Sequence, residues 1–109
     1  MRKESLAFLK TLLNTPSAVG HEAGIQKIWC DYVRPFADDI RTDSYGNAMA
    51  VLNPKSRPMV VLDGHCDDIS LMVKHISDEG LIYFQAMGGI DSAMLRSKRV
   101  DIHARKGPI

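Results

Sequence analysis

One short stretch of the sequence, LDGHCDD at residues 62–68, gathers side chains that could bind a metal ion. His65 can offer a neutral imidazole nitrogen to zinc or cobalt, and its other ring nitrogen then needs an acceptor that fixes the tautomer. Asp67 can be that acceptor, because residues two apart in an extended segment face the same side. Spacing alone also allows a plainer interpretation, a hydrogen-bonded histidine at a strand end beside turn-forming aspartates.

The neighbouring polar residues are weaker candidates for chemistry. Cys66 follows His65 directly, so in an extended segment the two side chains diverge and cannot form a nucleophile and its base. Asp63 and Asp68 each suit a turn next to glycine or at a strand end. The remaining histidines have no partner at ligand spacing, and we expect them to be structural: His21, His75 and His103.

A buried strand is expected to deliver this stretch to a functional position. Residues 59–62 form a short apolar run without polar alternation, which is typical of a strand covered on both faces of a parallel or mixed sheet. In open α/β sheets the carboxyl ends of such strands face the ligand crevice. We therefore expect His65 to project from a strand end into a crevice.

The rest of the chain predicts an α/β protein. Apolar residues recur at helical spacing over residues 5–14 and again from Glu22 to about Pro35. Strand patterns with turn formers between them predict hairpins over residues 39–52 and 69–86, and residues 100–103 suggest a last strand. The change from helices to hairpins suggests a domain boundary near Asp68.

Composition does not suggest a nucleic-acid or membrane partner. Lys and Arg number 14 against 13 Asp and Glu, so the net charge of +1 favours neither nucleic acid nor an anionic membrane. Basic residues near the carboxyl end lack interleaved aromatic side chains, which favours a solvated face. Two cysteines, no leader pattern and no long apolar run lead us to expect a cytoplasmic protein.

Four ordered motifs resemble the M42 family of metallo-aminopeptidases, which includes glutamyl and tetrahedral aminopeptidases. They are TPSAVGHE at residues 15–22, TDSYGN at 42–47, GHCDDI at 64–69 and GGID at 88–91. The resemblance implies that His65 binds one of two divalent ions, zinc or cobalt, and that Asp67 orients this ligand and counts as catalytic. It also implies peptide substrates, assembly into dimers, and a twelve-subunit particle.

The same resemblance implies a domain organisation. Residues 1–68 would be the amino-terminal part of a catalytic domain of the phosphorylase/hydrolase-like zinc peptidase type, in which two amphipathic helices feed a mixed sheet. Residues 69–109 would begin a smaller inserted β-rich dimerisation domain. Family members are several-fold longer, and their other ligands, bridging carboxylate and glutamate base come from later sequence. We therefore expect these 109 residues to be inactive alone.

Three positions depart from the family pattern. Cys66 stands where the family usually has an apolar residue, Asp68 where it has glutamate, and Ser70 where it frequently has glycine. The shorter acid at Asp68 would alter a hydrogen bond around the ligand and leaves the class of enzyme unchanged. The alternative function is a non-catalytic assembly module, or a remnant of such an enzyme, in which His65 is structural.

Overall fold

Two helices open the chain in the computed structural model, which describes residues 1–109. Helix α1 spans Lys3–Leu13 and helix α2 spans Ala23–Val33, so both predicted helices are confirmed. Asn14 ends α1, where its backbone N–H and its side-chain amide both donate to the carbonyl of Lys10. A 3₁₀ turn, η1 at Arg34–Phe36, ends α2, because its proline removes a helical donor.

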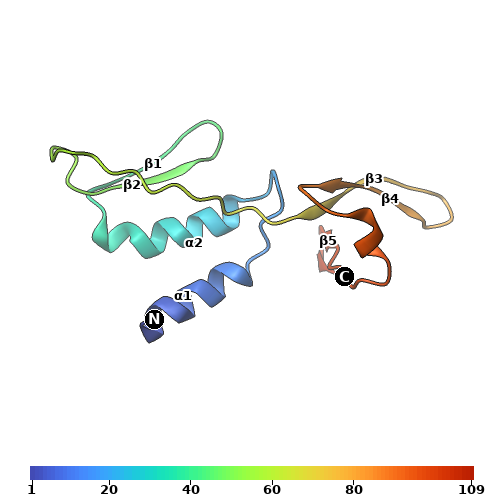
Figure 1. Ribbon diagram of the computed structural model, residues 1–109. Coiled ribbons are helices and arrows are strands. Elements are labelled where there is room, and N and C mark those ends of the chain that lie inside the picture. The colour runs from blue at the N-terminus through green and yellow to red at the C-terminus, as the bar shows by residue number, and fades with distance from the viewer. The chain divides into compact units, whose positions relative to one another are not determined.

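Helix α2 lies between α1 and a β-hairpin (Figure 1). The rings of Phe8 in α1 and Tyr32 in α2 stack with centroids 3.6 Å apart. Ile25 and Cys30 are the only buried apolar side chains, and Trp29 is half-buried. The core under α2 is therefore small.

The hairpin pairs β1, Asp39–Thr42, with β2, Ala48–Val51, in antiparallel register. Its turn is organised by Asp43, whose carboxylate accepts the backbone N–H of Asn47 at 2.9 Å and the side-chain amide of Asn47 at 2.8 Å. Gly46 has φ of +87°, a left-handed conformation that glycine adopts without steric cost. This hairpin confirms the strand pair predicted from the turn residues.

The expected buried strand at residues 59–62 is not present. These residues form no strand, and Val61 and Leu62 are 79% and 94% exposed. A strand buried on both faces needs neighbouring strands and covering helices. Each strand in these 109 residues pairs with another strand, and none pairs with residues 59–62. The prediction of a buried strand at residues 59–62 was therefore wrong for this chain.

The expected mixed sheet is likewise absent. The strands form three separate two-stranded sheets, all antiparallel: β1 with β2, β3 with β4, and β5 with β6. The only parallel pairing is an isolated bridge between Ala18 and Asp68. The architecture is thus a small α/β arrangement of two helices and three small sheets.

The chain divides into two compact units, Met1–Asp68 and Ile69–Ile109. The second unit contains the hairpin of β3, Ser70–Ile76, and β4, Ile82–Met87, which confirms the predicted pair. It continues through the 3₁₀ turn η2, Ser92–Leu95.

A small hairpin closes the second unit. It pairs β5, His103–Ala104, with β6, Gly107–Pro108, in antiparallel register. The last strand expected at residues 100–103 is therefore displaced to His103–Ala104, because a turn at residues 105–106 supplies a partner further along the chain.

Candidate functional site

His65 and Asp67 lie together at the surface of the first unit. The Nδ1 atom of His65 is 3.1 Å from Oδ1 of Asp67 and 3.2 Å from the backbone oxygen of Asp67. Both facing atoms are oxygens that accept hydrogen bonds, so Nδ1 carries a ring proton, and the neutral form of the ring with this proton has a free lone pair on Nε2. The side chain of His65 is 84% exposed and that of Asp67 is 40% exposed. The imidazole is therefore open to solvent and is not packed in a core.

The segment before this pair has little backbone support. No backbone hydrogen bond joins residues 57–67 to any other residue. The first such bond comes at Asp68, whose N–H donates to the carbonyl of Ser17 at 2.9 Å. Ser17 lies in the loop between α1 and α2 and is only 2% exposed. Nothing in residue type or spacing links the two positions, so the sequence does not predict this contact.

The other candidate residues are distributed over both compact units. Cys30 and Cys66 are free thiols, the first buried and the second half-buried. The ring of His75 packs near that of Tyr83, with centroids 5.8 Å apart, while His103 lies in β5. No group of three or more His, Cys, Asp or Glu side chains is arranged to hold a metal ion. These side chains therefore supply fewer than three candidate ligands at any one place.

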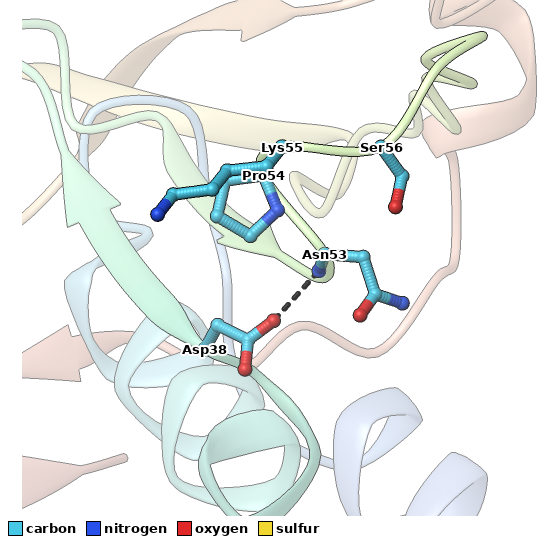
Figure 2. Close-up of a pocket in the computed structure, with 5 residues that line it drawn as sticks. All are labelled: Asp38, Asn53, Pro54, Lys55 and Ser56. Carbon is cyan, nitrogen blue, oxygen red and sulfur yellow. Dashed lines mark hydrogen bonds between the residues drawn. The ribbon is translucent and has the colours of Figure 1, made fainter.

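Figure 2 shows a shallow hollow beside the β1–β2 hairpin, lined by Asp38 and residues 53–56. The carboxylate of Asp38 accepts the backbone N–H of Asn53 at 2.6 Å. This bond satisfies a turn donor where the chain leaves β2, so the acid has a structural role. The hollow is open and offers no second acidic or imidazole side chain for catalysis.

The structure contains no helix that is long and apolar enough to cross a membrane.

Comparisons with known proteins agree on one family. The family model of M42 glutamyl aminopeptidases matches residues 46–109, more than half of the chain. The lysyl aminopeptidase of Pyrococcus furiosus is 30% identical over 100 residues, which cover 91% of this chain and 29% of that protein. The chain spans less than a third of the length of the curated relatives it matches.

Solved structures give the same result. The crystal structure of a TET aminopeptidase from a marine sediment archaeon of the Thaumarchaeota matches with a TM-score of 0.92 and 30% identity, covering 99% of this chain and 30% of that one. PhTET1-12s, whose structure is a dodecamer, matches with a TM-score of 0.78 and 27% identity over 100% of this chain and 32% of that one. This chain therefore belongs to the M42 family of aminopeptidases.

Proposed function

We propose that this chain forms the amino-terminal part of a metal-dependent aminopeptidase that hydrolyses the first peptide bond of its substrates. The observation that carries the proposal is the exposed His65 ring, whose Nδ1 faces the Asp67 carboxylate at 3.1 Å in a member of an aminopeptidase family. A carboxylate on one imidazole nitrogen is the usual arrangement behind a metal-bound histidine.

In this proposal His65 is a metal ligand through Nε2, and Asp67 orients it. The hydrogen bond from Nδ1–H to Asp67 holds the ring in the tautomer that leaves Nε2 free. The negative carboxylate also raises the basicity of the imidazole toward a cation. Asp67 therefore acts on the reaction through His65.

The metal requirement follows from the proposed chemistry. A pair of divalent ions, zinc or cobalt, would activate a water molecule and polarise the scissile carbonyl of a peptide. The donor set of this chain fits one position of such a centre, because an imidazole suits zinc and cobalt. A catalytic zinc typically takes about three protein ligands, so the others would have to come from outside these 109 residues.

The two compact units support a proposal for domain roles. Residues 1–68 would form part of the catalytic domain, and residues 69–109 would begin an inserted β-rich domain that makes dimer contacts. The exposed run at residues 59–62 supports the first assignment, because covering these apolar side chains with another strand or helix would lower the free energy of the folded protein.

Self-association is the partner interaction that we propose, since PhTET1-12s forms a dodecamer. A particle of that kind would act on peptides. Two free thiols suit a reducing compartment, so we place the protein in the cytoplasm.

Cobalt binding to the chain itself tests the candidate ligand. Paramagnetic Co²⁺ is added to the ¹⁵N-labelled chain, and the ring signals of all four histidines are followed. We expect the Nε2 signal of His65 to broaden at lower cobalt concentration than those of the internal controls, which are His21, His75 and His103. Equal broadening of all four rings would remove the metal-ligand assignment.

Turnover provides a second test. Release of the chromophore from an aminoacyl substrate is measured with added cobalt, and the isolated chain is expected to show none, because it supplies one ligand. Activity in the purified chain would refute this. If the reading frame continues past Ile109, its full product is expected to be active and to lose turnover with His65→Ala, whereas His75→Ala retains it.

The second candidate function is a non-catalytic assembly module. It is supported by the β3–β4 hairpin, whose apolar side chains are exposed in the second unit, Tyr83 to 55% and Phe84 to 49%. An assembly module predicts no preference of cobalt for His65, so the same titration separates the two functions.

A further inference from the structure

The loop between α1 and α2 is held at both ends by hydrogen bonds. Thr15 donates its backbone N–H to Leu12 at 3.1 Å, at the end of α1. On the other side, His21 donates its N–H to the carbonyl of Ala18 at 2.8 Å, and the N–H of Gly20 donates to the carboxylate of Glu22 at 2.7 Å. The loop is therefore tied to α1 and to Glu22, which directly precedes α2.

Ser17 is the buried centre of this loop. It is 2% exposed, and it is the only buried polar residue of the chain. Neighbouring residues enclose Ser17, so a shift of its backbone would displace them. The carbonyl of Ser17 is consequently a fixed acceptor.

This acceptor is the first backbone anchor reached by the chain after the long unsupported segment at residues 57–67. The loop lies beside the chain at this point (Figure 1), where Asp68 donates its N–H to Ser17 and forms the parallel bridge with Ala18. Asp67 directly precedes this bond, and its carboxylate is the group that faces His65.

We propose that Ser17 is a positioning residue for the His65–Asp67 pair, acting through its backbone carbonyl on the N–H of Asp68. With that bond made, the backbone at Asp67 has one direction, and its carboxylate stays within reach of Nδ1 of an otherwise exposed ring. Without it, no backbone hydrogen bond holds residues 57–69, and water replaces Asp67 as the hydrogen-bond partner of the ring. This inference rests on the proposed function, in which that pair binds the metal.

Two substitutions at one position isolate the backbone bond. Asp68→Pro removes the N–H that donates to Ser17, and Asp68→Ala keeps this N–H while removing the same carboxylate. Ring ¹⁵N shifts of the purified chain are recorded at about pH 9, where ordinary imidazoles are neutral and the shifts report the tautomer. We expect Asp68→Ala to keep the Nδ1–H tautomer of His65, and Asp68→Pro to lose it, with His75 and His103 unchanged.

Ser17 is tested from its own side. Ser17→Leu forces a larger side chain into a position with no free surface and is expected to lose the tautomer, while Ser17→Ala keeps it. A variant is interpreted only where the amide spectrum of the β1–β2 hairpin matches the parent chain. Retention of the tautomer in Asp68→Pro, or its loss in Asp68→Ala, would overturn the inference.

A measurement without any variant keeps the inference testable if the proline chain does not fold. A scalar coupling across the hydrogen bond between the Asp68 nitrogen and the Ser17 carbonyl carbon is expected, and its absence would contradict the proposal.

The cobalt titration separates this inference from the function. Selective broadening of His65 with an unchanged tautomer in Asp68→Pro removes only the role of Ser17. A lost tautomer without selective broadening in the parent chain removes only the metal site.

Discussion

At the scale of single residues, the candidate chemistry depends on one exposed hydrogen bond. The imidazole of His65 is 84% exposed, so water competes with Asp67 for its Nδ1 proton. The carboxylate has an advantage because its charge strengthens the bond and because it is attached two residues away. Removing the negative charge of Asp67 therefore tests how much this hydrogen bond contributes.

Asp67→Asn is the substitution that does so. The amide still offers one oxygen to Nδ1–H but carries no charge, so we expect the affinity of the chain for cobalt at His65 to fall about 10- to 100-fold. The cobalt concentration that broadens the His65 ring signal measures this. Asp63→Asn is the control, because it changes the same charge on an acid that makes no hydrogen bond with another residue. An equal effect of both substitutions would mean that only general charge attracts the ion.

Asp43 gives a residue-scale prediction of pH dependence. The side-chain amide of Asn47, followed by backbone N–H groups of the turn, holds the pKa of Asp43 below its ordinary value of 3.8. Because the folded state favours the carboxylate, its contribution to stability is complete above the ordinary pKa and is lost as pH falls through the lowered pKa.

We therefore expect Asp43→Ala to lower the urea midpoint of the first unit at pH 7, and to lower it less near pH 2. Chemical shifts of β1 and β2 report this unfolding. Asp63→Ala, which removes an acid without such bonds, is expected to leave the midpoint unchanged at both values. A shift for Asp43→Ala that is independent of pH would show that the turn does not depend on the charge.

At the scale of elements, the apolar residues fall into two groups with opposite exposure. Ile25 on α2 is 6% exposed and lies in the small core, while Val61 in the run at residues 59–62 is 79% exposed. Removing methyl groups creates a cavity only where the side chain is enclosed. The position of an apolar residue, and not its type, therefore decides its contribution to stability.

Ile25→Ala is expected to destabilise the first unit by about 2–4 kcal/mol, because it leaves a cavity under α2. Val61→Ala is the matched control and is expected to change stability by less than about 0.5 kcal/mol. Urea unfolding followed through Trp29 fluorescence measures both. A comparable loss in the two variants would indicate that residues 59–62 are covered in solution.

At the scale of the whole molecule, exposed apolar surface points to association. Tyr83 and Phe84 on β4 and the run at residues 59–62 all present apolar atoms to water. The dimer contacts that we propose lie in the second unit, so the two surfaces should respond differently to an added charge.

Phe84→Lys is expected to raise the dissociation constant of the proposed dimer by about tenfold or more, because an aromatic side chain that the contact would bury is lost and a charge would be desolvated. Leu62→Lys, in the exposed run, is expected to leave it unchanged. Sedimentation velocity over a range of concentrations measures both constants. Dispersal of the dimer by Leu62→Lys and not by Phe84→Lys would place the contact in the first unit.

The amino-acid sequence by itself determined the features that depend on neighbouring residues. Helical spacing predicted α1 and α2, turn formers predicted the β1–β2 and β3–β4 hairpins, and the spacing of two residues brought His65 and Asp67 together. The roles assigned to this pair remain predictions. The ordered motifs identified the family, which the comparisons confirm.

Only the tertiary structure decided whether residues 59–62 are covered and what anchors Asp68. An apolar run indicates a preference for burial, but burial needs other strands or helices that cover the run. No strand within residues 1–109 pairs with residues 59–62, and their side chains are exposed. The bond between Ser17 and Asp68 joins two backbone groups, which every residue except proline possesses. Side-chain patterns carry no signal for such a contact, because it depends on how the loop after α1 folds back in space.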